Sequence, residues 1–503
     1  MANNRIYTSS RTYDAANRPL THTFPSGDTT HWAYDTRNLV TSVHYQNKLV
    51  VANSYDAGYR LTNQSFANGL NRTINYTRQD NLRTADHVIG KDDLHFSYNY
   101  AADKQITAEN IVGDVVQNSM FTASYDGGNR LVSHTNNASN PLNQNWNYDD
   151  AGNWDSTTKT IGNTTTTENR THNAADQITN IAGNTATHDA KGNLTAYEIN
   201  GKQYQVEYDL ENRITKVDVD NDEVEYRYDA FGRRTIREED NVSTALIWWG
   251  NSECAEHKHR ANQTVIQNDI MEHPSRLNSV IARAINGSKN KLQWYHKNYL
   301  DHVYAVSDDS GGLIEHYRYT AFGEVSIYDA NGNLETETQI ENTIMWNTRR
   351  LDAVSGFYLY KYRHYSPELG RWPSRDPLGE VDHEMLKSLT KDIYFTGEKS
   401  FNVYSFVENN PLYYIDTYGE GFWDWLNNIF TSVDPGTTGD VVDGGMALGA
   451  AAVVATCIQA RNALLDCLAD TPGECDDEAD LVDKLCNAAK KCARAATGND
   501  PED

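Results

Sequence analysis

The segment Y-L-Y-K-Y-R-H-Y-S-P-E-L-G-R-W-P-S-R-D-P-L-G, residues 358–379, combines strand, turn and charge patterns in a short stretch. It opens with tyrosine at alternate positions, Tyr358, Tyr360 and Tyr362, which is the period of a half-buried strand. The S-P-E-L-G sequence that follows has proline and glycine where a turn requires them. Two arginines, a tryptophan and a carboxylate then surround two tight turns. We expect the rest of the chain to be organised around this segment.

The composition favours strands and turns over helices. The chain has 503 residues, of which 38% are hydrophobic, and tyrosine alone contributes 31. This length allows two to four domains or one large repetitive domain. The net charge of -26 argues against binding to nucleic acid or to an anionic membrane, because both require a basic surface. We therefore expect no nucleic-acid partner.

The N-terminal residues M-A-N-N-R-I-Y-T are polar and show no secretory signal peptide. The chain would then begin inside a longer precursor, leave the cell by a route without such a signal, or stay inside. One stretch, 446–458, is apolar enough to consider for a membrane. It is alanine-rich and shorter than the roughly 18–20 residues that a spanning helix needs, so we expect a soluble helix there.

Tyr-Asp pairs recur along the first half of the chain. The first four tyrosines of the series, at positions 13, 34, 55 and 76, are spaced 21 residues apart, and looser echoes follow as far as Tyr228-Asp229. The unit reads Y-D-x-x-x-R-L, in which Asp, Gly and Asn supply a turn that tolerates positive φ. Each unit therefore predicts a β-hairpin, and the hairpins must stack because one alone cannot bury its own face. Repetition favours a structural role for the pairs over a catalytic one.

These units resemble the YD repeats of RHS proteins, of insecticidal toxin-complex C subunits and of teneurins. The segments H-Y-R-Y-T-A-F-G-E-V (316–325), 358–379 and N-V-Y-S-F-V-E-N-N-P-L-Y-Y-I-D-T-Y-G (402–419) are similar to the RHS repeat-associated core. The resemblance covers about residues 5–419. It implies a mainly β fold, with hairpins stacked into a spiralling sheet or hollow shell that the core plugs at one end. The shell would enclose a C-terminal cargo, usually a toxin.

Four regions follow from this interpretation. They are a YD-repeat sheet (1–240), a continuation of the shell with a loop or short helix near 263–292 (241–345), the core plug (346–419), and a cysteine-containing helical tail that is the candidate cargo (420–503).

The tail is expected to form a small α-helical hairpin, with helices over 444–470 and 479–495. Its cysteine density suggests disulfides and an oxidising destination, so we expect a secreted or cell-surface bacterial protein. The odd count leaves Cys254 as a partner or a free thiol. The disulfide candidates are Cys457, Cys467, Cys475, Cys486 and Cys492.

The resemblance also implies intramolecular aspartyl proteolysis. Many RHS cores cut their cargo free after a second D-P-x-G-L motif, using two carboxyl groups that share a proton. By resemblance, Asp376 is the first catalytic candidate and Asp382 is the second. Arg371 or Arg375 would orient or tune the pair.

The expected cleavage motif departs from the family pattern. It reads D-T-Y-G-E, from Asp416 through Gly419 to Glu420, so proline is absent and an acidic residue replaces leucine. An added carboxylate should perturb a pair that shares a proton. A further departure is the long segment 379–401, with a short helix expected over 381–389. Two interpretations stay open: cleavage near Gly419–Glu420, or a buried ion-pair and turn network around Asp376 that only caps the shell, which the departures favour slightly.

The leading function is an RHS-type shell that encloses or presents a C-terminal effector or toxin module. Its partners would be its own tail, the rest of a longer shell or secretion machinery, and an immunity protein. The alternative is a cell-surface adhesion or glycan-binding module without proteolysis, in which exposed aromatic residues stack on sugars. No cofactor is expected. We also expect no metal at Cys254, His257 and His259, because a fourth ligand is missing.

Overall fold

A computed structural model describes residues 6–77, 82–89, 92–113, 119–137, 141–260, 263–274, 279–377, 402–416 and 419. The chain divides into a larger unit (Met1–Asp56, Leu61–Pro377 and Asn402–Asp424) and a smaller one (Ala57–Arg60, Leu378–Phe401 and Trp425–Asp503). Every strand of the described residues belongs to the larger unit. The predicted helical hairpin, the tail cysteines, Asp382 and Glu420 lie outside the described residues.

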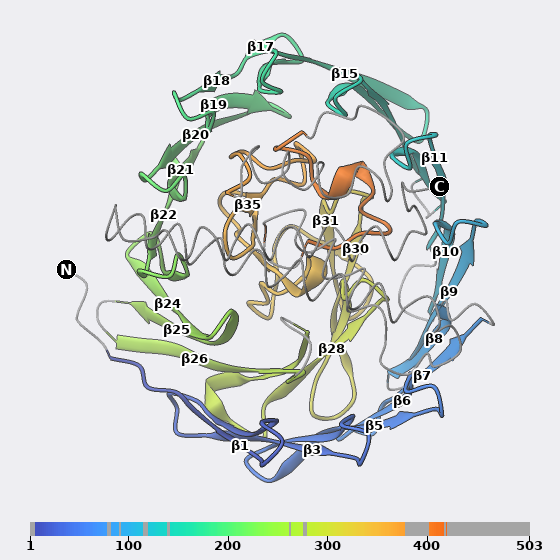
Figure 1. The fold of residues 1–503 in the computed structure, drawn as a ribbon, viewed down its shortest axis with the longest axis vertical. Coiled ribbons are helices and arrows are strands. Elements are labelled where there is room, and N and C mark those ends of the chain that lie inside the picture. The colour runs from blue at the N-terminus through green and yellow to red at the C-terminus, as the bar shows by residue number, and fades with distance from the viewer. Residues whose placement is uncertain are drawn as a thin grey trace, which may run out of the picture. The chain divides into compact units, whose positions relative to one another are not determined.

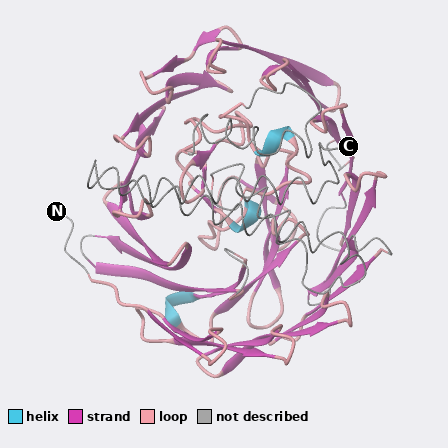
Figure 2. Cartoon of the chain, in the orientation of Figure 1, coloured by secondary structure: helices cyan, strands magenta, loops and turns pink. Residues whose placement is uncertain are grey.

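Antiparallel strands dominate the larger unit, as predicted (Figure 2). The first sheet has 17 strands: β1 (Ser10–Tyr13), β2 (Pro19–Thr23), β3 (Thr29–Tyr34), β4 (Val40–Tyr45), β5 (Lys48–Tyr55), β6 (Leu61–Phe66), β7 (Asn71–Tyr76), β8 (Leu82–Ile89), β9 (Asp92–Tyr100), β10 (Ile106–Val112), β11 (Ser119–Tyr125), β12 (Leu131–Asn136), β13 (Leu142–Tyr148), β14 (Trp154–Ile161), β15 (Thr164–His172), β16 (Ile178–Ile181) and β17 (Asn184–Thr185).

The second sheet has 15 strands: β18 (Thr187–His188), β19 (Leu194–Ile199), β20 (Lys202–Tyr208), β21 (Ile214–Val219), β22 (Asp222–Tyr228), β23 (Arg234–Glu239), β24 (Val242–Trp249), β25 (Ser252–Arg260), β26 (Gln263–Glu272), β27 (Val280–Ala284), β28 (Leu292–Lys297), β29 (Val303–Ser307), β30 (Leu313–Tyr319), β31 (Val325–Asp329) and β32 (Leu334–Glu335). A small third sheet contains β33 (Arg350–Leu351), β34 (Tyr358–Leu359) and β35 (His364–Tyr365). Within each sheet, sequence neighbours pair side by side, which is the stacking of hairpins that the repeats predict.

Helix is sparse in the described part of the chain. It holds the 3-10 turns η1 (Ile285–Gly287), η2 (Trp346–Thr348) and η3 (Val407–Asn409). Segment 263–292, expected to leave the repeat as a loop or short helix, contains β26, β27 and η1. None of the helices among the described residues is long and apolar enough to cross a membrane.

The strands β19 to β22 have one apolar face and one polar face, whereas β27 and β29 are buried along their whole length. In β20, Tyr204 and Val206 are buried, while Gln203, Gln205 and Glu207 point to solvent. This is the period of two that a half-buried strand requires. The buried faces of β19 to β22 pack against Phe357, Leu359 and Leu369 of the core segment.

The Tyr-Asp pair builds the turn at one end of each hairpin. In the unit at Asp209, carboxylate Oδ1 accepts the backbone N–H groups of Glu211 and Arg213, and Oδ2 accepts Arg213 Nε at 2.7 Å. Asn212 takes a φ of 62°, which asparagine tolerates. In the next unit, the Tyr228 hydroxyl donates to the carbonyl of Ile214 at 2.6 Å. The repeat therefore encodes a self-satisfied turn, and the structural role predicted for it agrees with these contacts.

Most residues from 358 to 376 are buried, with Tyr362, Glu368 and Arg375 partly exposed. In Figure 1, β35 lies inside the ring that the strands of the larger unit draw. Tyr358, Tyr360 and Tyr365 have no exposed surface, and Trp372 and Phe406 are almost fully buried with them. Their rings contact one another, with centroids of Tyr365 and Phe406 3.8 Å apart. This aromatic cluster forms the wall of the candidate site.

Polar contacts tie the same segment to distant strands. Arg170 Nη1 donates to the carbonyl of Leu369 at 2.6 Å, and the N–H of Leu194 donates to the carbonyl of Pro373 at 2.9 Å. The Tyr358 hydroxyl donates to the carbonyl of Gly323 at 2.9 Å. The core segment is thus fixed to both large sheets.

Candidate functional site

Arg363 is the centre of a buried polar group in this cluster. It follows the short strand β34 and is only 2% exposed. Its guanidinium carbon stands 4.1 Å above the ring of Trp372, where stacking replaces the water that the cation has lost. Nη1 donates to the carbonyl of Val403 at 3.3 Å. The remaining donors face two carboxylates and one peptide carbonyl.

Asp376 and Asp416 meet at one nitrogen of this guanidinium. Nη2 of Arg363 lies 3.1 Å from Asp376 Oδ2 and 3.5 Å from Asp416 Oδ2. Both aspartates are buried, at 7% and 1% exposure. The N–H of Asp376 donates to the carbonyl of Val403, which also accepts from Arg363. Two buried carboxylates therefore share one cation.

Gly419 completes the group. Its carbonyl oxygen accepts Arg363 Nε at 2.5 Å, and its N–H donates to Asp416 Oδ1 at 2.5 Å. Its φ is +80°, and a Cβ there would lie 2.9 Å from Cβ of Tyr360. Only glycine avoids both the left-handed strain and this contact. The last described residue of the expected cleavage motif is therefore held against Asp416 and Arg363.

Not all of the predicted site residues join this group. Arg371 donates to Asn153 Oδ1 at 3.2 Å and to the carbonyl of Asp176 at 2.7 Å, so it holds the core segment to the first sheet. Burial lowers its pKa to about 9. Arg375 lies beside Gly192, with its Cδ 3.0 Å from where a Cβ would stand. Asp376 and the motif residues Asp416 and Gly419 are brought together, whereas Arg371 and Arg375 contact the repeats.

Comparison with known proteins places this arrangement in a family. The model of the teneurin YD-shell matches residues 87–412, and the model of the RHS repeat matches residues 13–47. The chain belongs to the teneurin YD-shell family. The match includes Arg363 and Asp376, and it stops just before Asp416.

Among curated relatives, this YD-shell is 29% identical over 138 residues to toxin subunit YenC2 of Yersinia entomophaga, covering 27% of the chain and 12% of that protein. It is 24% identical over 282 residues to the tRNA3(Ser)-specific nuclease WapA of Bacillus spizizenii, covering 56% of the chain and 11% of that protein. The chain thus spans about one eighth of the length of these relatives.

Solved structures share the fold of this YD-shell. The TcdB2-TccC3 crystal structure superposes with a TM-score of 0.67 at 18% identity, covering 83% of this chain and 22% of that one. The Tc holotoxin pore of Photorhabdus luminescens gives a TM-score of 0.66 at 19% identity, covering 82% and 21%. The predicted β-shell fold is therefore confirmed.

Arg363 is the residue of this YD-shell site that the sequence analysis missed. An arginine within the aromatic run Y-K-Y-R-H-Y must be buried if the run is buried, and a buried arginine requires acceptors. That signal pointed to a carboxylate partner, but the spacing did not show which one. Asp416 was read only as part of the cleavage motif, and its carboxylate lies on the same guanidinium as Asp376.

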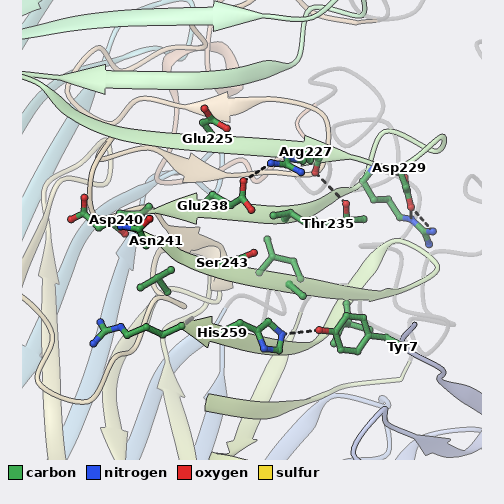
Figure 3. A pocket seen from close by; sticks show the side chains of 18 of the residues that line it. Tyr7, Glu225, Arg227, Asp229, Thr235, Glu238, Asp240, Asn241, Ser243 and His259 are labelled. Carbon is green, nitrogen blue, oxygen red and sulfur yellow. Dashed lines mark hydrogen bonds and ion pairs between the residues drawn. The ribbon is translucent and has the colours of Figure 1, made fainter. Parts of the chain in front are cut away.

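A broad groove of about 1570 Å³ lies elsewhere on the YD-shell, over β22 to β25 (Figure 3). Its charged side chains are largely paired, as in the contact between Arg227 and Glu238 at 2.6 Å. His259 lies within hydrogen-bond distance of Tyr7 Oη (2.8 Å) and of Thr264 Oγ1 (3.1 Å), one at each ring nitrogen. Cys254 is buried, forms no disulfide with a described residue, and has a pKa raised by burial. Both ring nitrogens of His259 are therefore engaged within this groove.

Proposed function

We propose that this YD-shell encloses or presents the segment that follows Gly419 as an effector, and releases it by intramolecular aspartyl proteolysis. The observation that carries the proposal is the convergence of Asp376, Asp416 and the Gly419 carbonyl on Arg363. Relatives that are similar to parts of this chain include a toxin subunit and a tRNA-specific nuclease. We also propose that the protein is bacterial and that it is secreted or displayed at the cell surface.

The chemistry needs one water and no cofactor. One aspartate, as a carboxylate, takes a proton from a water molecule. At the same time the oxygen of that water bonds to the carbonyl carbon of Gly419. The other aspartate, as carboxylic acid, gives its proton to the nitrogen of Glu420, and the C–N bond breaks. The products are a carboxylate on Gly419 and a free amine on Glu420. A cut one bond later would place the new amine on Gly421.

Arg363 has two tasks in this reaction. Its Nε already binds the Gly419 carbonyl oxygen, so it stabilises the negative charge that develops there. Its Nη2 binds both carboxylates, which we expect to act on the Gly419–Glu420 peptide. We therefore assign to Arg363 the role first expected of Arg371 or Arg375.

Intact-mass measurement tests the proposal. The wild-type chain should yield a fragment that begins at Glu420 or Gly421, and Asp376→Asn and Asp416→Asn should each yield one mass near 56.7 kDa. Asp352→Asn is the matched control, because Asp352 is also buried and paired with an arginine, Arg237, outside the site. A single full-length mass for the wild type would contradict proteolysis and leave the capping network as the function of these residues.

Enclosure needs a separate test. Limited proteolysis should spare the segment after Gly419 until the shell is denatured, and its rapid loss from the native protein would rule enclosure out. The adhesion alternative needs aromatic side chains free to stack on sugars. Most repeat tyrosines are instead packed with the hydroxyl on a backbone carbonyl, as at Tyr148, Tyr208 and Tyr228. These contacts favour the shell over the adhesion module.

A further inference from the structure

One turn of the first sheet departs from the repeat at three positions that lie together. In the standard unit, Asp209 is followed by Arg213 and Thr215, and the next strand ends in Tyr228. The guanidinium of Arg213 covers the Tyr228 ring, 4.7 Å from its centroid. Arg130 covers the ring of Tyr148 in the same way.

In the unit of Asp149, each of these partners is replaced. Asn153 stands in place of the arginine, Asp155 in place of the threonine, and His172 in place of the next tyrosine. The register confirms the correspondence, because Tyr148 pairs with Trp154 as Tyr208 pairs with Ile214, and Ser156 pairs with Asn169 as Lys216 pairs with Glu225. The exchange replaces the arginine of the turn with an amide that Arg371 of the core segment binds, and it adds a carboxylate and an imidazole beside Asp149.

The three ligating side chains converge. One carboxylate oxygen each of Asp149 and Asp155 and one ring nitrogen of His172 all lie within 4.8 Å of one another. Ligands at the usual bond length of roughly 2.0–2.2 Å lie at most about 4.4 Å apart, so a small rotation of the exposed Asp155 side chain closes the site.

His172 lacks the bond that the tyrosine makes in other units. There the hydroxyl donates to the carbonyl of the strand before, as Tyr148 does to Leu131 and Tyr228 does to Ile214. Both ring nitrogens of His172 are buried, and neither has a hydrogen-bond partner among the described residues. A buried polar atom without a partner is costly, which calls for a ligand at this position.

We propose that Asp149, Asp155 and His172 bind a divalent transition-metal ion. One imidazole nitrogen and two carboxylate oxygens, with water in the remaining positions, suit Mn²⁺ or Zn²⁺ better than Ca²⁺, which takes oxygen ligands. The ion would hold the ends of three strands, β13 to β15, at the rim of the sheet.

A single residue, Asn153, links Asp149 of the proposed site to the core segment. Asp149 accepts both the N–H and the side-chain amide of Asn153, at 2.8 and 2.9 Å. The Oδ1 atom of Asn153 accepts in turn from Arg371 Nη1 and from Asn402 Nδ2, at 3.2 and 2.6 Å. A metal at Asp149 therefore also stabilises the contact through which the core segment is bound to the repeats.

Manganese binding to the full chain tests the site. Mn²⁺ is the probe because the five cysteines of the tail compete for Zn²⁺. After EDTA treatment and dialysis, the wild type should remove one equivalent of free Mn²⁺ from the six-line EPR signal and should melt at a higher temperature with Mn²⁺ than without. The same titration with Ca²⁺ should give much weaker binding.

Asp155→Thr and His172→Tyr restore the standard repeat residues, so both variants should fold, which their circular dichroism checks. Each should bind Mn²⁺ on the order of 10- to 100-fold more weakly and lose the thermal shift. His188→Tyr is the matched control, since His188 takes the tyrosine place in the next unit, where Asn173 and Thr179 occupy the sequence positions of Asp149 and Asp155. It should bind as the wild type does. Equal Mn²⁺ binding in the wild type and both restored variants, or none in any of them, would overturn the proposal.

Discussion

A single buried arginine shows how local chemistry defines the candidate site. Arg363 loses water on burial, and it recovers interactions from the Trp372 ring, two backbone carbonyls and two carboxylates. The planar guanidinium supplies donors in several directions at once, whereas an ammonium group is a point charge. The residue is therefore not exchangeable for lysine even though the charge is the same.

Arg363→Lys should slow release of the fragment by about 100-fold or more, the typical cost of losing one donor to a developing oxyanion. Arg371→Lys, which changes an arginine that contacts Asn153 and Asp176, should cleave at the wild-type rate. Fragment accumulation followed by intact mass measures both. Equal cleavage rates in the two variants would show that Arg363 has no part in the reaction.

Alanine substitutions at two glycines separate the cost of a steric contact from the cost of a strained backbone. Gly370 and Gly356 have nearly the same φ, +66° and +68°, but a Cβ at Gly370 would lie 2.1 Å from the Trp154 ring, and a Cβ at Gly356 would contact nothing. Gly356→Ala should cost about 1–2 kcal/mol from the left-handed conformation. Gly370→Ala should cost a further 1–3 kcal/mol or more, because the core segment must move off β14. Chemical denaturation compares them, and equal losses would contradict the contact.

At this scale the sequence predicted part of the site. Asp376 was identified from its motif, and Asp416 and Gly419 were assigned to the cleavage motif. The meeting of Asp376 and Asp416 was not predictable from spacing, because it depends on how two separate segments return to Arg363. The second predicted carboxylate, Asp382, lies outside the described residues and stays a prediction.

At the scale of elements, the repeat works as a hairpin that satisfies its own polar groups. The tyrosine of one unit bonds to the carbonyl of the unit before it, and the aspartate closes its own turn. Periodicity was enough to predict strands, stacking and the structural role of the pair. The two-residue turns at the opposite ends were not predicted, although Asn200-Gly201 and Asp220-Asn221 have the positive φ values of type I′ turns.

Tyr228→Phe should lower the free energy of unfolding by about 1–2 kcal/mol, since it leaves the carbonyl of Ile214 without its donor. Tyr13→Phe is the control, because Tyr13 is 46% exposed, and it should change stability by less than about 0.5 kcal/mol. Urea denaturation provides the measurement. If Tyr13→Phe lowered the free energy of unfolding as much as Tyr228→Phe, the hydrogen bond of the Tyr228 hydroxyl would not be what stabilises the sheet.

On the scale of the whole molecule, two buried carboxyl groups join the large sheets. Glu109 of β10 accepts from Tyr304 and Asn298, at 3.1 and 3.4 Å. Asp269 of β26 accepts from Ser26 and Tyr45, at 2.6 and 2.7 Å. Burial raises the pKa of Glu109 to about 7, against the hydrogen bonds from Tyr304 and Asn298, and burial raises the pKa of Asp269 to about 6, with Asp28 adding to it.

These shifts predict that stability falls as pH rises from about 4 to 7. A carboxyl group whose pKa is raised by folding binds its proton more tightly in the folded state, so its contribution is complete below the unfolded value and is lost as pH rises through the folded one. For Glu109 the loss is on the order of 3 kcal/mol.

Glu109→Gln keeps the acceptor without the charge and should flatten this part of the stability profile, measured as melting temperature against pH. Glu211→Gln is the control at an exposed side chain and should leave the profile unchanged. A profile of Glu109→Gln that parallels the wild type would show that Glu109 does not carry the pH dependence.

Family and architecture were predictable from the sequence because each repeat specifies its own geometry, and the comparisons confirm both. The contacts between sheets were not predictable, because they join residues more than 180 positions apart and no periodic pattern records them. The helical tail stays a prediction, since it lies outside the described residues.

The bonds from Ser26 and Tyr45 to Asp269 also have a consequence for how the protein is made. A ribosome synthesises the first strands long before it reaches β26. The apolar residues of the early strands that pack in the same core as β26, Phe24 and Trp32 among them, therefore stay exposed until β26 has been made. Contacts of such sequence separation make folding slow. The nascent chain is therefore expected to depend on chaperones until translation has passed residue 300, and slower elongation over the early repeats should not improve its yield.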